Sequence, residues 1–179
     1  MISDFHHVAF RCKNAKETVA FYRDILGLEF TLAIAEDKVP STGENNPYMH
    51  IFLQVGQAHL AFFELPNSPE MGTDLNTPNW VQHIALKVKN NEKLLQIKNY
   101  LESLGHNVLG PVNHGIFHSI YFHDPSGHRL ELVVDQELTY KGESANKVLK
   151  KLADEMLTEW SLTGEPPKHA QWLHSTLDS

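Results

Sequence analysis

An internal repeat constrains the fold of this chain more than any other feature of its sequence. His7-Val-Ala-Phe-Arg aligns with His83-Ile-Ala-Leu-Lys, with His on His, Ala on Ala and a basic residue on a basic residue. In each half an asparagine follows, then a helical pattern, and then three further segments with strand-like patterns. Because self-similarity of this kind indicates a duplicated structural unit, the sequence predicts two tandem βαβββ modules.

The spacing of apolar residues gives the expected bounds of each element. The first half is predicted to contain a helix between Asn14 and Gly27, and strands over 5–12, 28–35, 49–55 and 58–65. The second half is predicted to contain a helix over 91–104, and strands over 82–88, 107–112, 117–123 and 128–134. The polar run Glu36–Pro47 predicts a loop long enough to form a lid or pocket rim.

The fold class expected from this pattern is α+β, with the two modules forming a curved mixed sheet around a metal cavity and a helix at the C-terminus. The boundaries follow from the repeat and from a Pro- and Asn-rich connector. We expect a first module over 1–66, the connector over 67–80, a second module over 81–136 and a helical appendage over 137–179. An amphipathic pattern over 144–160 predicts the main helix of the appendage, which would pack on its own domain or on a second subunit.

The last hairpin of the second half contains a carboxylate in apolar surroundings. Asp124-Pro-Ser-Gly127 has the Pro and Gly spacing of a type I turn, and Glu131 follows on the returning strand between Leu130 and Leu132. A carboxylate in mid-strand is costly to desolvate unless it meets a cation, a hydrogen-bond network or a metal.

The repeat supplies candidate partners for this carboxylate. His7 and His83 open the two halves, and Glu64 and Glu131 close them, each Glu flanked by leucine or phenylalanine. A single His or Glu at such a place is usually structural, but the same pair in both halves favours a metal site. We expect all four to share a partly polar surface, as an N2O2 site, or as a two-His, one-carboxylate triad if Glu64 stays out.

Composition narrows the classes of function. With 15 Lys and Arg against 22 Asp and Glu, the net charge of -7 argues against nucleic acid as the main partner. The single cysteine, Cys12, excludes an intramolecular disulfide. No signal segment and no apolar stretch of membrane-spanning length is visible, so we expect no membrane association and a cytoplasmic location.

Residues 5–135 resemble the vicinal oxygen chelate superfamily, which includes glyoxalase I, extradiol ring-cleaving dioxygenases, fosfomycin-modifying enzymes and bleomycin-resistance proteins. The resemblance is carried by the duplicated βαβββ pattern, by Phe21-Tyr-Arg-Asp-Ile-Leu-Gly-Leu28 and by the hairpin from Asp124 to Glu131. It implies a divalent metal, a small-molecule substrate that chelates it through two adjacent oxygens, and a homodimer in which residues 144–179 are a candidate contact.

The resemblance implies three alternative functions. In an extradiol dioxygenase, Fe(II) would be bound by His7, His83 and Glu131. His114 or His118 would be the acid–base group, and Tyr121 would hydrogen-bond to a substrate oxygen. In a glyoxalase I-like lyase or isomerase, Glu64 would be a fourth ligand to Ni(II), Zn(II) or Mn(II). A bleomycin-resistance-like protein would bind a drug without metal. We favour the dioxygenase, because its pattern runs from His114 to Glu131 and because six aromatic residues could line a flat pocket: Phe52, Phe62, Phe63, Trp80, Phe117 and Tyr121.

Overall fold

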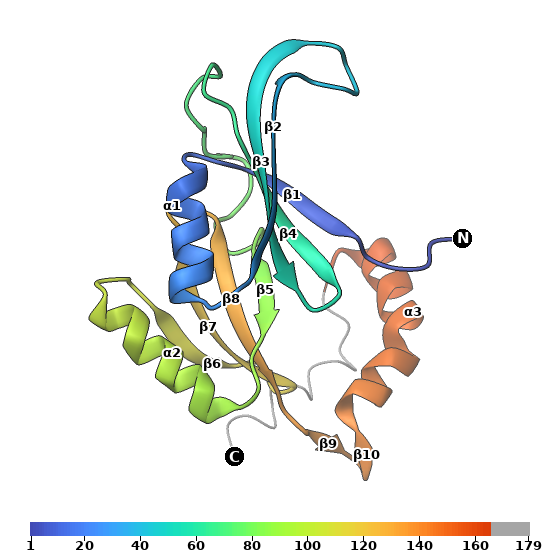
Figure 1. Ribbon diagram of the computed structural model, residues 1–179. Helices are drawn as coiled ribbons and strands as arrows, with labels where there is room; N and C mark the ends of the chain where they lie inside the picture. Colours follow the sequence, from blue (N-terminus) through green and yellow to red (C-terminus); the bar gives the residue numbers. More distant parts are fainter. Residues whose placement is uncertain (166–179) are drawn as a thin grey trace. The chain divides into compact units, whose positions relative to one another are not determined.

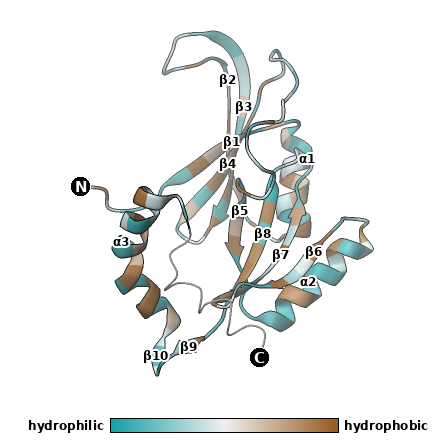
Figure 2. Cartoon of the chain, turned by 180° about the vertical axis from the view of Figure 1, so that it is seen from behind, coloured by the Kyte–Doolittle hydropathy of each residue, from teal (hydrophilic) through white to brown (hydrophobic). Residues whose placement is uncertain are grey.

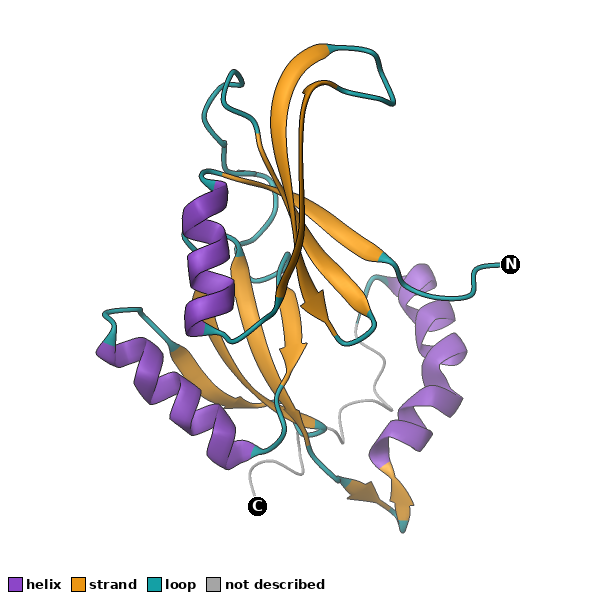
Figure 3. Cartoon of the chain, in the orientation of Figure 1, coloured by secondary structure: helices purple, strands orange, loops and turns teal. Residues whose placement is uncertain are grey.

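The computed structural model of the chain describes residues 1–165 and forms two compact units. The first comprises Met1–His83 together with His123–Arg129, and the second comprises Ile84–Phe122 and the chain from Leu130 onward. Each unit contains one four-stranded mixed sheet with a helix between its first and second strands, and a further helix follows the second sheet (Figures 1 and 3). The predicted α+β fold with tandem βαβββ modules and a C-terminal helix is confirmed.

The first sheet has the strand order β1-β4-β3-β2, with β1 and β4 parallel and the other pairs antiparallel. Its elements are β1 (His7–Cys12), α1 (Ala15–Val19), the π-helical turn η1 (Ala20–Ile25), β2 (Phe30–Lys38), β3 (Asn45–Val55) and β4 (Ala58–Glu64). Asn14 is the N-cap of α1, since its side chain accepts a hydrogen bond from the Glu17 amide at 2.9 Å.

The loop between the second and third strands is shorter than the predicted range of 36–47. β2 and β3 continue as a paired hairpin, with Glu36 opposite Tyr48 and Lys38 opposite Asn45, and Figure 1 shows this hairpin extending beyond β1 and β4. Because the extension lies at the edge of the sheet and is largely exposed, its residues carry no apolar alternation that the sequence pattern could detect.

The two faces of the first sheet differ in character. Phe10, Leu60 and Phe62 lie on the face that α1 and η1 cover, where the Phe62 and Tyr22 rings are 5.1 Å apart. We call this the helix face. Side chains alternate along strands, so His7, His50 and His59 lie on the opposite side, which we call the histidine face.

The second sheet has the order β5-β8-β7-β6. Its elements are β5 (Ile84–Lys87), α2 (Asn91–Ser103), β6 (Leu109–Asn113), β7 (Phe117–His123) and β8 (Arg129–Asp135). Ile120, Phe122, Leu130 and Leu132 are buried on one face, and α2 buries Leu94 and Leu101. Two short strands that the sequence did not predict follow, β9 (Thr139–Tyr140) and β10 (Glu143–Ser144).

The turn between β7 and β8 belongs to the first unit and contains a buried carboxylate that bonds to Tyr22 of the same unit. The predicted turn is present, since the Gly127 amide donates to the Asp124 carbonyl at 3.0 Å. The Asp124 carboxylate accepts from the His128 ring at 2.9 Å and from the Tyr22 hydroxyl at 3.1 Å. Burial alone would raise the pKa of Asp124, but the bonds from His128 and Tyr22 hold this pKa below its usual value.

Helix α3 (Ala145–Thr163) packs on β9 and β10 and leaves a large apolar surface in contact with solvent. Leu157 is 68% exposed and Trp160 51% exposed, and Figure 2 shows hydrophobic residues along the helix. No helix within residues 1–165 is long and apolar enough to cross a membrane. Trp172 and Leu173, which the sequence also assigns to the appendage, lie outside the described residues.

Candidate functional site

Glu64 does not lie with His7, contrary to the sequence expectation. In the parallel pairing of β1 and β4, His7 lies opposite His59, whereas Glu64 lies opposite Cys12. The two side chains are therefore five residues apart along the sheet, about 16 Å at the usual rise of a strand. They also project from opposite faces, because Glu64 shares the helix face with Cys12.

Glu64 instead caps the first helix. Its Oε2 accepts a hydrogen bond from the Ala15 amide at 2.6 Å. The first amides of a helix have no partner within the helix, and a carboxylate at this end also interacts favourably with the helix dipole. The contact with the Ala15 amide thus accounts for the position of Glu64 without a metal.

The position in the first module that matches Glu131 is occupied by alanine. Glu131 lies opposite Ala85 in the pairing of β5 and β8. The corresponding pair in the first module is Ala9 and Ala61. The duplication therefore keeps its histidine in both halves and its carboxylate in the second half alone.

Glu131 is 4% exposed and belongs to a row of three hydrogen-bonded side chains. The Tyr121 hydroxyl donates to Glu131 Oε1 at 2.7 Å, and His114 Nε2 lies 2.8 Å from the same hydroxyl oxygen. Since the hydroxyl proton is directed at the carboxylate, the His114 ring donates its Nε2 proton to the Tyr121 oxygen. The sequence-predicted residues His114, Tyr121 and Glu131 are thus brought together within the second unit.

The backbone around His114 fixes its place. The His114 amide donates to the Phe117 carbonyl at 2.9 Å, and the Asn113 side chain accepts from the Gly115 amide at 2.9 Å. This turn closes the β6–β7 hairpin and holds the His114 backbone next to Phe117, the first residue of β7.

His118, the alternative acid–base candidate, does not share a face of β7 with Tyr121. It is an odd number of residues from Tyr121 on β7, so the two side chains leave opposite faces of the strand. His118 Nδ1 lies 3.3 Å from the side-chain oxygen of Asn91, at the start of α2. It therefore lies on the side of the sheet that α2 covers.

The two histidines that open the modules have different surroundings. His83 Nδ1 lies 3.0 Å from the Val81 carbonyl, which fixes the proton on Nδ1 and makes Nε2 the basic nitrogen of the ring. A carbonyl in this role is typical of metal-binding histidines. The exposed His7 ring contacts Phe52, with ring centroids 5.6 Å apart, and its Nδ1 lies 2.6 Å from that of His6.

Sequence reasoning missed two histidines on the histidine face, His50 and His59. His59 is the direct neighbour of His7 across β1 and β4. His50, on β3, is 9% exposed, and its ring lies between Phe63 and Phe52, with centroids 3.6 Å and 4.1 Å away. Burial first, and the nearby His7 second, lower the pKa of His50. The sequence carries no signal for this grouping, because the positions of His50 and His59 relative to His7 depend on how β1, β4 and β3 pair.

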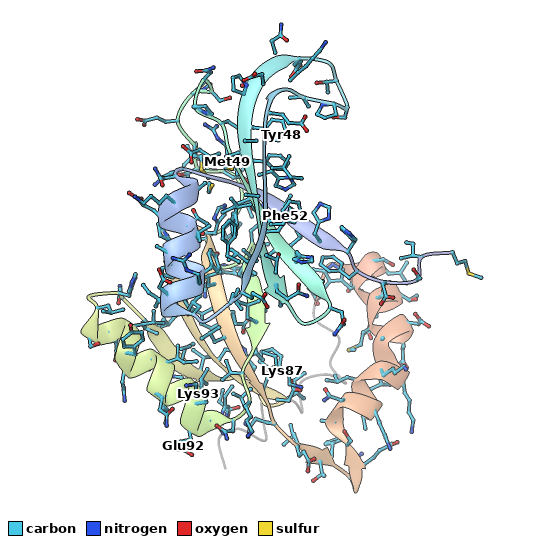
Figure 4. All side chains as sticks on the ribbon, in the orientation of Figure 1. Tyr48, Met49, Phe52, Lys87, Glu92 and Lys93 are labelled. Atoms are coloured by element: carbon cyan, nitrogen blue, oxygen red, sulfur yellow. The ribbon has the colours of Figure 1, made fainter. Side chains whose placement is uncertain are left out.

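The expected aromatic pocket is present only in part. Phe62 lies on the helix face against Tyr22, and the Trp80 side chain is 68% exposed. Phe52 and Phe63 do lie on the histidine face, and Figure 4 shows Tyr48 and Phe52 along β3.

The three remaining metal-ligand candidates are divided between the units. His7 and His83 belong to the first unit and Glu131 to the second, and within residues 1–165 no three His, Cys, Asp or Glu side chains are gathered in a metal-binding arrangement. The chemistry of the donors nevertheless suits a divalent ion: two imidazoles and one buried carboxylate.

Comparison with known proteins identifies the family. Residues 4–132 match the model of the Glyoxalase/Bleomycin resistance protein/Dioxygenase superfamily. The chain belongs to this superfamily. Its members are often metal-dependent enzymes that bind small molecules. No curated protein matches the sequence significantly.

Several solved structures share the fold. An integron cassette protein from the mobile metagenome of the Halifax Harbour sewage outfall is 28% identical, with a TM-score of 0.50, over 74% of this chain and 99% of that one. A glyoxalase family protein from Enterococcus faecalis is 23% identical, with a TM-score of 0.54, over 73% and 97%. The fosfomycin resistance protein FosX from Listeria monocytogenes is 22% identical, with a TM-score of 0.55, over 76% and 94%.

Proposed function

We propose that this chain is a metal-dependent enzyme of the extradiol ring-cleaving type, with His7, His83 and Glu131 as metal ligands and a catechol-like aromatic substrate. The observation that carries the proposal is the hydrogen-bonded row from His114 through Tyr121 to Glu131. In this row two groups that can donate protons, Tyr121 and His114, lie next to Glu131, the carboxylate that would bind the metal ion.

The donor set supports this choice over the glyoxalase-like alternative. Two histidines and one carboxylate form the facial triad typical of non-haem Fe(II) oxygenases, which leaves coordination positions for substrate and O2. The glyoxalase-like arrangement needs Glu64 as a fourth ligand, and Glu64 caps α1. FosX, which shares the fold, has been solved with Mn(II), so we propose Fe(II) first and Mn(II) second.

The metal, when bound, would supply the Lewis acidity that holds two adjacent substrate oxygens and the redox chemistry that activates O2. The chain's own residues would handle protons and orientation. Tyr121 holds the Glu131 carboxylate in one orientation, and its hydroxyl can turn its proton to a substrate oxygen. The His114 Nε2 proton then stabilises the Tyr121 oxygen, so His114 serves as the acid–base group behind the tyrosine. Both atoms of O2 enter the product, and no external reductant is required.

The test is turnover by protein purified and loaded with Fe(II) without oxygen. Catechol and O2 should be consumed in equal amounts, with the yellow ring-opened product forming. We expect Tyr121→Phe and His114→Gln to lower kcat by about a hundredfold or more, and His118→Gln, the matched control on the other face of β7, to leave it nearly unchanged.

Two outcomes would overturn the proposal. Turnover of methylglyoxal with glutathione by the Ni(II) or Zn(II) form, without catechol cleavage, would establish the lyase. Absence of bound metal, together with ligand binding that survives His83→Ala, would establish a drug-binding protein.

The homodimer is proposed to form through α3. The apolar residues Leu157 and Trp160 are exposed to solvent and could be buried by a packing partner. The distribution of charge along the helix suggests that this partner is a second copy of α3. The N-terminal half carries lysines and the C-terminal half acidic residues: Lys147, Lys150, Lys151, Asp154, Glu155 and Glu159. Two copies of α3 packed antiparallel would place the basic half of one against the acidic half of the other.

A further inference from the structure

Two nitrogens on the histidine face are buried without a hydrogen-bond partner among residues 1–165, Arg11 Nε and His50 Nε2, and the second belongs to an imidazole beside His7. His50 Nε2 is shielded from solvent, and no described group hydrogen-bonds to it. A buried polar atom left unsatisfied costs about 1–3 kcal/mol, so such atoms are rare and call for a specific cause.

The ring that carries this nitrogen is held firmly. The Phe63 ring stacks on it nearly parallel, at 3.6 Å between centroids and 17° between planes. The Phe52 ring covers it from another side at 4.1 Å. Because two aromatic rings pack against the imidazole, the direction of Nε2 is fixed before a ligand binds. Such preorganisation is typical of side chains that bind a ligand specifically.

The surroundings of His50 suit an aromatic ligand. Its ring centroid is 6.2 Å from that of His7, the proposed metal ligand on the same face. Phe63, which stacks on His50, also lines a cavity of about 350 Å³ with Tyr48 and with Val39, Pro40, Ser41, Asn46 and Leu65. This volume is at the lower end of the range for small-molecule sites.

We propose that His50 recognises an uncharged hydrogen-bonding substituent, such as a hydroxyl or amide, on the ring of the substrate. The inference rests on the proposed function and narrows its substrate class to catechols that carry such a group. We choose an uncharged group because the His50 ring lies against Phe63 and Phe52, and a neutral group costs less free energy to desolvate beside aromatic rings than a charged one does.

The test compares two substituents of equal size. Hydroxymethylcatechols and ethylcatechols, each substituted at ring position 3 or 4, differ in one hydroxyl group. In the Fe(II) protein we expect kcat/KM to favour the better hydroxymethyl isomer by about tenfold or more. His50→Phe should abolish this preference, and His50→Gln should retain part of it.

Stability gives an independent readout. Since Phe leaves no buried polar atom unsatisfied, His50→Phe should be as stable to urea as the natural chain, or more stable. A marked loss of stability, with the substituent preference intact, would show that His50 is a structural residue and overturn the inference. So would equal preference in the natural chain and in His50→Phe.

Equilibrium binding separates this inference from the proposed function. If the protein cleaves no catechol, the proposed reaction fails, but the affinities of the same two ligands for the metal-loaded protein without oxygen still measure the preference. Tighter binding of the hydroxymethyl compound that disappears in His50→Phe would uphold the recognition site. Equal binding would refute it.

Discussion

The assignment of Glu64 to the cap of α1 can be tested against its rival role as a metal ligand. The informative pair of changes is Glu64→Leu, which removes the acceptor of the Ala15 amide, and Glu64→Gln, which keeps an acceptor oxygen and removes its charge. Glu131→Gln, in the second module, is the matched comparison.

The magnitude follows from the contact. A hydrogen bond to a charged group is worth about 1.5–3 kcal/mol, and the dipole of the helix end adds about 0.3–1 kcal/mol. Solvent reaches Glu64 in part, so the lower end of this range applies. We expect Glu64→Leu to lower the free energy of unfolding by about 1–2 kcal/mol and Glu64→Gln by about 1 kcal/mol or less.

The assay combines urea unfolding with metal analysis. The unfolding midpoint should fall in the order natural chain, Glu64→Gln, Glu64→Leu, with an unchanged slope m. The Fe(II) content after anaerobic loading should be unchanged in both Glu64 variants and strongly reduced in Glu131→Gln. Loss of metal from Glu64→Gln equal to that from Glu131→Gln, without loss of stability, would refute the cap.

Three further predictions follow from buried and exposed groups. Burial raises the pKa of Cys12 to about 11, so we expect no reaction of the folded protein with a disulfide reagent at pH 8 and reaction of one thiol after denaturation; rapid reaction of the folded chain would contradict this. Folding lowers the pKa of Asp124, so its ionised carboxylate stabilises the folded protein above about pH 4. This contribution to the free energy of unfolding is lost as the pH falls through the pKa of Asp124 in the folded state. Asp124→Asn should lower stability at pH 7 by about 1–3 kcal/mol and flatten its acid dependence in unfolding curves from pH 3 to 7, and an unchanged curve would count against the network. At the proposed α3 contact, Lys150→Glu should raise the dimer dissociation constant about tenfold by sedimentation, and adding Glu155→Lys should restore it; a monomeric natural chain would exclude the contact.

The features that the sequence predicted well are local ones. Asn14 and Asn90 cap the two helices as their positions indicate, and the turn at Asp124 closes where Pro and Gly allow it. Each of these features depends on residues a few positions apart. The long β2–β3 hairpin was missed because its polar, exposed extension carries no periodic signal.

Glu64 and His118 lie apart from the other candidate residues for one physical reason. Glu64 was matched to Glu131 through its apolar neighbours, but the strand pairing equates Glu131 with Ala61, three residues earlier. An odd offset moves a side chain to the other face of a strand, as it does for His118 relative to Tyr121. Register depends on which strands pair, and the sequence of a single strand does not contain that information.

The loss of Glu64 from the site makes the two modules unequal in a way that bears on function. With alanine at position 61, the first module offers imidazoles and aromatic rings on its histidine face. The second module offers a buried carboxylate and its proton donors, Tyr121 and His114. A duplicated fold would by itself give two equivalent half-sites. Under the proposed function, this difference at one position, Ala61 against Glu131, would leave substrate recognition to the first module and proton transfer to the second, and the His50 and Tyr121 variants measure these two roles separately.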